Sequence, residues 1–119
     1  MIDQDLGRRM YTADFCLPVL IGEEQGMNIA NELATVLEMT PIEHSHTWTY
    51  PVGEYKGGWG FTFVQPITES FIAIDSYLNH PACYVMIRSC KQFNIDRVRA
   101  LFEDLNYPVT EWRMSNLGL

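Results

Sequence analysis

Basic side chains are scarce in this sequence: eight Lys and Arg residues stand against fifteen Asp and Glu residues, which gives a formal net charge of −7. This excess of negative charge opposes binding to nucleic acid and to anionic lipid, and it suits a cationic ligand better. Long apolar runs are also lacking, since none approaches the roughly 20 residues of a membrane span. The acidic residues 1–5 are followed by no apolar segment typical of a secretion signal. We therefore expect a cytoplasmic protein without nucleic-acid or membrane partners.

Cysteine is rare, and complete metal-ligating patterns are lacking. Cys16, Cys83 and Cys90 are an odd number without C-x-x-C spacing, which predicts reduced thiols rather than a disulfide framework. His44 and His46 lie two apart in a predicted strand and so face the same way. A metal site needs at least a third ligand, and the pattern places none beside them. We predict no metal site.

Hydrophobic periodicity predicts two helices and six strands. The first helix lies within residues 22–39, where apolar residues recur at helical spacing. Asn94 is the expected N-cap of the second helix, whose apolar stripe runs to Leu105. In the stretch 68–77 a turn leads into a strand. The other strands are predicted over residues 10–17, 42–50, 59–67, 83–90 and 109–114, and His80 is placed in the turn before the fifth strand.

The order of these elements predicts the fold class. Strands joined by short turns pair mostly antiparallel, and two amphipathic helices can cover only one face of such a sheet. We therefore predict one α+β domain over residues 1–119, a two-layer sandwich with both helices on one face. The other face is expected to carry Trp59, Phe61 and Phe63, and an uncovered apolar face predicts a homodimer formed through the sheet.

One pair of residues, Glu69 and Ser70, carries a resemblance to a known family. Cys90 follows Ser70 after twenty residues, and Gly7 and Arg8 precede the first predicted strand. This spacing resembles the small bacterial and archaeal S-adenosylmethionine decarboxylases, whose pattern is roughly E-S-H-x-x-x-H-T-W-P-E followed by T-C-G. The resemblance covers about residues 7 to 112 and implies the S-adenosylmethionine decarboxylase-like fold, a homodimer of stacked sheets, and a role in polyamine (spermidine) biosynthesis.

The resemblance also implies roles for four residues. In the family, the serine at the position of Ser70 attacks the carbonyl carbon of the residue at Glu69, and the ester that forms eliminates to leave a pyruvoyl group. That group is the electron sink for the decarboxylation of the substrate. The family's histidine base corresponds to Asp75, and its cysteine proton donor corresponds to Cys90.

The departures from the pattern fall on this chemistry. Phe71 and Asp75 replace the two histidines, and residues 76–79 replace T-W-P-E. Aspartate titrates near 3.9 and histidine near 6.5, so as a base the carboxylate is weaker by about 3.5 kcal/mol. Self-cleavage would slow about a thousandfold if this penalty were expressed fully in the barrier.

We therefore hypothesise that the bond between Glu69 and Ser70 stays intact, that no cofactor forms, and that the protein is a pseudoenzyme that binds a ligand or regulates a partner. The alternative is an active pyruvoyl-dependent lyase that cleaves before Ser70 and decarboxylates S-adenosylmethionine or another amino acid. Within the family, non-catalytic relatives that pair with an active homologue set a precedent for a pure interaction protein.

A cationic adenosyl ligand would need aromatic rings and a negative charge. The rings nearest to the motif in the sequence are Phe71, Tyr77 and Trp59, and the carboxylates are Glu69 and Asp75. We predict that these residues bind S-adenosylmethionine or a similar cationic small molecule.

Overall fold

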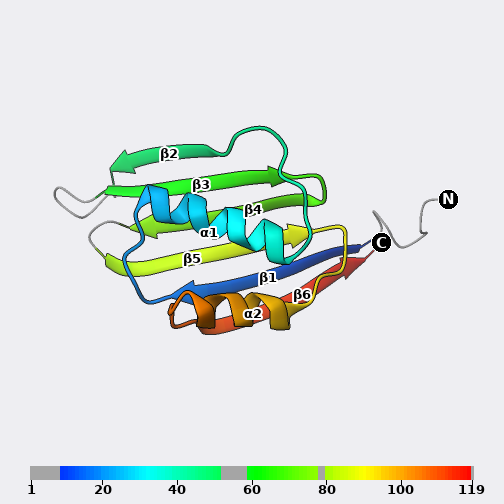
Figure 1. Ribbon diagram of the computed structural model, residues 1–119. Helices are drawn as coiled ribbons and strands as arrows, with labels where there is room; N and C mark the ends of the chain where they lie inside the picture. Colours follow the sequence, from blue (N-terminus) through cyan, green and yellow to red (C-terminus); the bar gives the residue numbers. More distant parts are fainter. Residues whose placement is uncertain (1–8, 52–58, 78–79, 119) are drawn as a thin grey trace.

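The computed structural model describes residues 9–51, 59–77 and 80–118. Its elements follow the predicted order of strand, helix, four strands, helix and strand (Figure 1). They are β1 (Arg9–Leu17), α1 (Glu23–Val36), β2 (His46–Pro51), β3 (Trp59–Ile67), β4 (Ser70–Tyr77), β5 (His80–Ser89), α2 (Ile95–Asp104) and β6 (Thr110–Gly118).

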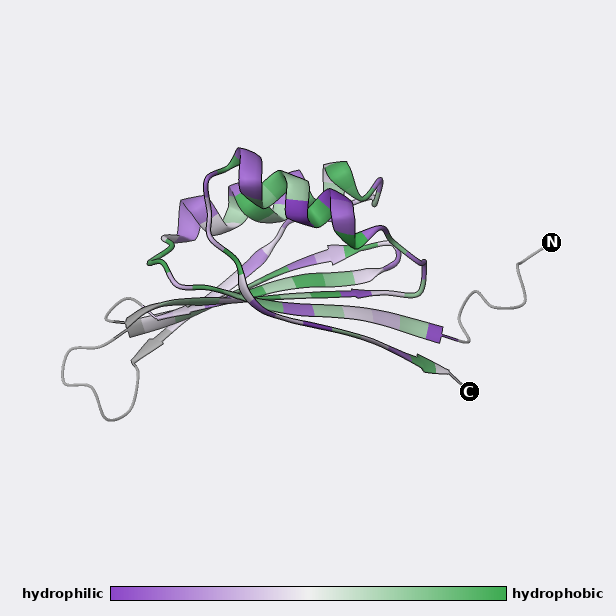
Figure 2. Ribbon diagram, turned by 90° about the horizontal axis from the view of Figure 1, so that it is seen from below, coloured by the Kyte–Doolittle hydropathy of each residue, from purple (hydrophilic) through white to green (hydrophobic). Residues whose placement is uncertain are grey.

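The six strands form one sheet in the order β2-β3-β4-β5-β1-β6, and every pair of neighbours is antiparallel. Figure 2 shows the sheet from its edge, with α1 and α2 together on one side. The predicted two-layer α+β fold is therefore confirmed. We call the sheet surface that faces the helices the helix face and the opposite surface the open face.

Local sequence explains the second helix. The backbone N–H of Asp96 donates to Oδ1 of Asn94 at 2.9 Å, as expected of an N-cap. Val98, Leu101 and Phe102 form the buried face of α2. Leu105, which we predicted on the same stripe, is 37% exposed because the helix ends at Asp104. Neither helix in the described part of the chain is long and apolar enough to cross a membrane.

The core lies between the helices and the sheet, and it corrects one prediction. Phe61 and Phe63 are only 2% and 1% exposed and belong to this core, so their predicted place on the uncovered face is wrong. The register explains the difference, because Phe63 pairs with the buried Ile74 and Phe61 with the buried Ser76. Paired residues in neighbouring strands point to the same face of a sheet.

Three strand boundaries also differ from the prediction. The second strand begins at His46 rather than at residue 42, because Glu43 takes a positive φ of 54° that interrupts extended backbone. The fifth strand begins at His80, since the ladder with β4 reaches the pair Tyr77 and His80, so the prediction of a turn at His80 is wrong. The last strand continues to Gly118, which pairs with Arg9.

Candidate functional site

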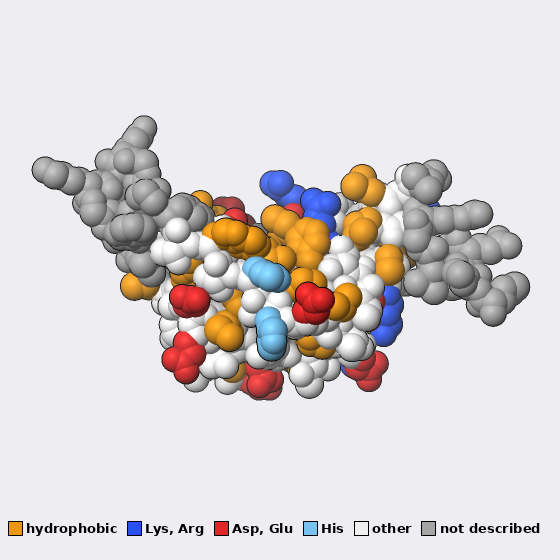
Figure 3. Space-filling view, turned by 90° about the horizontal axis from the view of Figure 1, so that it is seen from above, with side chains coloured by type: hydrophobic (Ala, Val, Ile, Leu, Met, Phe, Trp, Pro, Cys, Tyr) orange, Lys and Arg blue, Asp and Glu red, His pale blue; other side chains and the backbone are white. Residues whose placement is uncertain are grey.

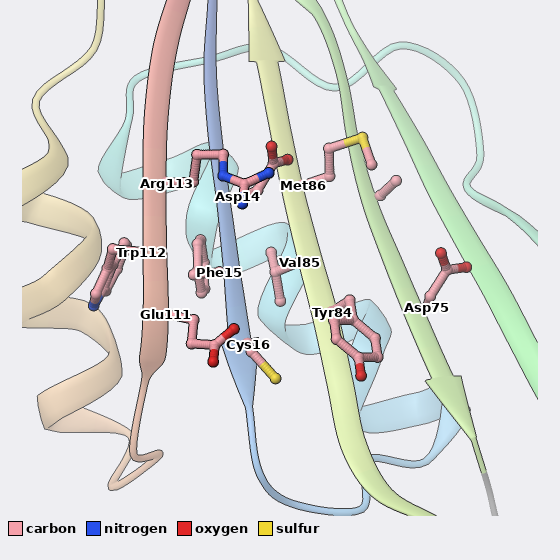
Figure 4. A pocket seen from close by; sticks show the side chains of 11 residues that line it. Asp14, Phe15, Cys16, Asp75, Tyr84, Val85, Met86, Glu111, Trp112 and Arg113 are labelled. Carbon is pink, nitrogen blue, oxygen red and sulfur yellow. The ribbon is translucent and has the colours of Figure 1, made fainter.

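The open face carries a shallow pocket of about 550 Å³ over β4, β5, β1 and β6. We call it the open-face pocket. Figure 4 shows Asp75 on β4, Tyr84 on β5 and Cys16 on β1 beside one another, with Glu111 on β6 at the far side. Its complete lining consists of Asp14, Phe15, Cys16, Ala73, Asp75, Tyr84, Val85, Met86, Glu111, Trp112 and Arg113.

Strand register brings the central residues of the pocket together. Asp75 pairs with Tyr84, and Tyr84 pairs with Cys16. Two residues away on each strand, Ala73 pairs with Met86, and Met86 pairs with Asp14. In this second row Ala73 and Met86 supply an apolar floor beside the polar residues, because neighbouring pairs on one face lie side by side.

Negative charge dominates the pocket. Its lining includes the three carboxylates of Asp14, Asp75 and Glu111 against the single guanidinium of Arg113, which extends toward Asp14 in Figure 4. The hydroxyl of Thr62 donates to Oδ1 of Asp75 at 2.6 Å, which fixes this carboxylate on the open face. Opposite charge near a carboxylate lowers the energy of both, so this lining suits a cationic group.

Aromatic rings border the open-face pocket beside Asp75. The ring of Tyr84 is 47% exposed and meets the ring of Tyr77 edge to face, with 6.2 Å between centroids. Exposed aromatic faces attract cations that approach within about 6 Å. The combination of Asp75 with these rings therefore suits an organic cation better than a small anion.

A β-bulge explains how Glu111 reaches the pocket. The register between β1 and β6 shifts between Asp14 and Cys16, and Glu111 has a positive φ of 54°. Bulges redirect a side chain relative to regular alternation. Sequence reasoning missed Glu111 because neither feature has a signature in the residues around it. For Asp14 and Cys16 there was a signal, since both alternate with buried neighbours in β1.

The residues of the family motif lie at the other end of β4. Thr68 and Glu69 form the turn between β3 and β4, and the backbone N–H of Cys90 donates to the carbonyl oxygen of Glu69 at 2.9 Å. The Thr68 hydroxyl donates to Oε2 of Glu69 at 2.5 Å. The structure thus brings together Glu69, Ser70 and Cys90, three of the four residues predicted to be catalytic.

Asp75, the fourth, is not brought to Ser70. Asp75 follows Ser70 by five positions along β4, which at about 3.3 Å per residue corresponds to about 16 Å. Ser70 shares the helix face with Ile72 and Ile74, whereas Asp75 lies on the open face. Beside Ser70 the register places Ile67 and Ser89.

The three rings predicted to bind the ligand are also divided. Phe71 lies at the motif end of the open face, between Pro66 and Arg88. Tyr77 lies at the end near the pocket, in contact with Tyr84. Trp59 begins β3 opposite Pro51, and its side chain falls outside the described residues.

The histidines do not assemble a metal site within the described structure. His46 stacks against Trp48 with 6.0 Å between ring centroids. Figure 3, which views the molecule from the β2 side, shows hydrophobic side chains gathered beside two histidine side chains. Across the ranges 9–51, 59–77 and 80–118, no three His, Cys, Asp or Glu residues form a group that could hold a metal ion.

Cys83 lies on the helix side of the sheet, close to the pocket. Burial, with smaller contributions from Cys16 and Asp75, raises the pKa of its thiol from 9.0 to about 12. The thiol is therefore protonated at neutral pH and is not a nucleophile, because the thiolate is the reactive form.

This shift predicts a loss of stability in alkaline solution. The unfolded chain releases the Cys83 proton near pH 9, while the folded protein retains it up to about pH 12. The free energy of unfolding should therefore fall across that window, by up to about 1.4 kcal/mol per pH unit. Urea titrations at about pH 8 and pH 10 would give, for the wild type and for Cys83→Ala, the change in the free energy of unfolding between the two pH values. We expect a smaller decrease with pH for Cys83→Ala than for the wild type. An equal decrease in both proteins would contradict the account.

Comparison with solved structures gives a likeness of fold. The crystal structure of the adenosylmethionine decarboxylase from Aquifex aeolicus VF5 superposes with a TM-score of 0.61 over 93% of this chain and 89% of that chain. The two sequences are 17% identical over the match, so the likeness concerns the fold alone. No protein-family model matches the sequence, and no curated protein matches it.

Proposed function

We propose that this protein is a non-catalytic binding protein with the adenosylmethionine decarboxylase fold, which keeps the bond between Glu69 and Ser70 intact and binds S-adenosylmethionine or a similar organic cation on its open face. The observation that carries the proposal is the loss of both motif histidines. Phe71 and Asp75 stand at their positions, and the Asp75 carboxylate accepts a hydrogen bond from the Thr62 hydroxyl at 2.6 Å.

An aspartate in place of the family's histidine base would slow the conversion of Ser70, because a carboxylate is a weaker base than an imidazole. Elimination of the ester requires a group within hydrogen-bond reach of the serine α-proton. The nearest cross-strand partners of Ser70 are Ile67 and Ser89, and the hydroxyl of Ser89 already bonds the backbone of Lys91. Neither partner replaces the missing base. The residues beside Ser70 therefore lack the histidine that the family uses for this step, and we propose that no cofactor forms.

The open-face pocket supports the binding half of the proposal. Asp75 supplies a fixed negative charge, Tyr84 and Tyr77 supply rings, and Ala73 and Met86 supply an apolar floor. A sulfonium nucleoside carries a positive charge beside flat and apolar parts, and this lining complements each of them.

A homodimer formed through the open face is also part of the proposal. Trp48 on β2 is 55% exposed and Leu117 on β6 is 64% exposed, and both lie on this face. Stacking two open faces would cover them and enclose the pocket between two sheets. Sedimentation equilibrium of the wild type and of Trp48→Glu would test this arrangement, with a weaker dimer expected for the variant.

Calorimetric and thermal-shift titration with S-adenosylmethionine tests the binding. A ligand at a hundred times its Kd stabilises the folded state by about 2.7 kcal/mol. We expect saturable stabilisation without release of carbon dioxide. No stabilisation at saturating concentrations would favour an interaction protein that pairs with an active homologue, in the same cytoplasmic polyamine-related setting.

The second candidate is an active pyruvoyl-dependent decarboxylase, and one contact favours it. The N–H of Cys90 donates to the Glu69 carbonyl oxygen at 2.9 Å, and this is the carbonyl that Ser70 would attack. A backbone donor at that position would stabilise the oxyanion formed in the attack. Release of carbon dioxide on addition of S-adenosylmethionine would establish this candidate in place of the first.

A further inference from the structure

Arg88 holds a central position on the open face. It lies on β5, which has three strands on one side and two on the other. Its cross-strand neighbours on that face are Phe71 on β4 and Thr12 on β1. The side chain is partly buried although no described helix covers this face, because its neighbours on the strands surround it.

The guanidinium of Arg88 has an unmet hydrogen-bond donor. Its Nε is fully buried and has no hydrogen-bond partner in the described structure. Phe71 offers no acceptor, and the hydroxyl of Thr12 is engaged with Oγ of Ser115 at 2.7 Å. Within the described ranges the one ion pair joins Arg97 to Glu38, so no carboxylate neutralises Arg88. A buried unsatisfied donor is rare in folded proteins and calls for a partner.

The chemistry of that partner follows from the donor. Arginine presents Nε–H and one Nη–H in a planar fork, and this fork matches the two oxygens of a carboxylate. A water molecule could satisfy one N–H but would leave the charge uncompensated. The expected partner of Arg88 is therefore a carboxylate that the described residues do not supply.

Arg88 and the open-face pocket lie along one line of the sheet. Phe71, the partner of Arg88, precedes Asp75 by four residues on β4, which corresponds to about 13 Å. Between them lie Ala73 and Met86, which pair with each other. The face thus presents a positive group, an apolar floor and a negative group in sequence. Such a surface complements a molecule with a carboxylate at one end and a cation further along.

We propose that Arg88 determines ligand specificity by binding the carboxylate of the ligand whose cationic part lies at Asp75. This inference rests on the proposed binding function and adds to it the residue that distinguishes an amino acid from the corresponding amine. Neither the family motif nor the sequence pattern marks Arg88 for this role.

Two ligands that differ only in the carboxylate test the inference. S-adenosylmethionine and its decarboxylated form carry the same sulfonium and the same nucleoside. Calorimetric titration of the wild type should give a Kd about tenfold to a hundredfold lower for the carboxylate-bearing ligand. Arg88→Met should remove this preference and leave the Kd of the decarboxylated ligand nearly unchanged. Arg88→Lys, which keeps the charge but loses the fork, should retain part of the preference.

Arg97→Met is the matched control, because it removes the same charge from α2, in the helix layer and away from the open face. It should leave the preference for the carboxylate unchanged. Equal affinity of the wild type for both ligands would overturn this inference while leaving the proposed function in place. Binding of neither ligand would overturn the proposed function and, with it, the inference. If Arg88→Met weakened the dimer and left the preference intact, the carboxylate would belong to a second copy of the chain, which would also overturn it.

Discussion

Replacing Phe63 by alanine should lower the free energy of unfolding by about 3–5 kcal/mol, because the change removes a buried ring and leaves a cavity. Phe63 is 1% exposed and pairs with the buried Ile74 in the layer between the sheet and the helices. Urea denaturation of the variant should show a lower midpoint with an unchanged dependence on urea concentration. A loss of this size is a large part of the stability of a small domain.

Trp48→Ala is the matched control for Phe63→Ala. Trp48 lies on the neighbouring strand, is 55% exposed and faces the opposite side of the sheet. Its replacement should change the free energy of unfolding of the monomer by less than about 1 kcal/mol, as exposed substitutions usually do. If the two variants lost equal stability, Phe63 would not be in the core, and the assignment of the two sheet faces would be wrong.

Asp75→Asn should raise the Kd for S-adenosylmethionine by about tenfold to a hundredfold, since a hydrogen bond or contact to a charged group contributes about 1.5–3 kcal/mol. Asparagine keeps a side-chain oxygen that can accept from the Thr62 hydroxyl, so the variant removes the charge with little change of shape. Isothermal titration calorimetry at fixed ionic strength would measure the difference.

Asp104→Asn removes the same charge from the end of α2, on the other layer of the molecule, and serves as the control. We expect its Kd to match that of the wild type. An unchanged Kd for Asp75→Asn would separate the ligand from the open-face pocket and would remove the main support for the binding site. A similar loss in both variants would indicate a general effect of net charge instead.

Much of the fold could be predicted because local patterns here agree with the final structure. The alternation around Ile72 and Ile74 marks a strand with one buried face, and both residues are buried. Asn94 marks the start of α2 through its short acceptor side chain. The element order then limits the architecture to an antiparallel sheet with helices on one side.

The orientation of β3 could not be predicted from its own residues. Phe61 and Phe63 alternate with Thr62 and Val64, and both sets are compatible with a buried face. Only the register with β4 places the two rings under the helices. The bulge at Glu111 is a second case, because a positive φ at a glutamate has no local sequence signal.

The candidate site, too, could be predicted only in part. The spacing of Ser70 and Cys90 reflects a contact between neighbouring strands, and the structure places Cys90 against Glu69. The separation of Asp75 from Ser70 could be predicted in part, since two residues an odd number of positions apart along a strand point to opposite faces. The open-face pocket could not be predicted from the sequence. Residues of β1, β4, β5 and β6 form it, and the registers of these strands follow from tertiary pairing.

The mass of the freshly purified protein under denaturing conditions tests the central claim most directly. If the chain lacks a base at Ser70, its peptide bond to Glu69 remains intact, and mass spectrometry should give a single species near 13.7 kDa. Two fragments that separate between Glu69 and Ser70, the second beginning with a pyruvoyl group, would contradict the account and identify the protein as a self-processing enzyme.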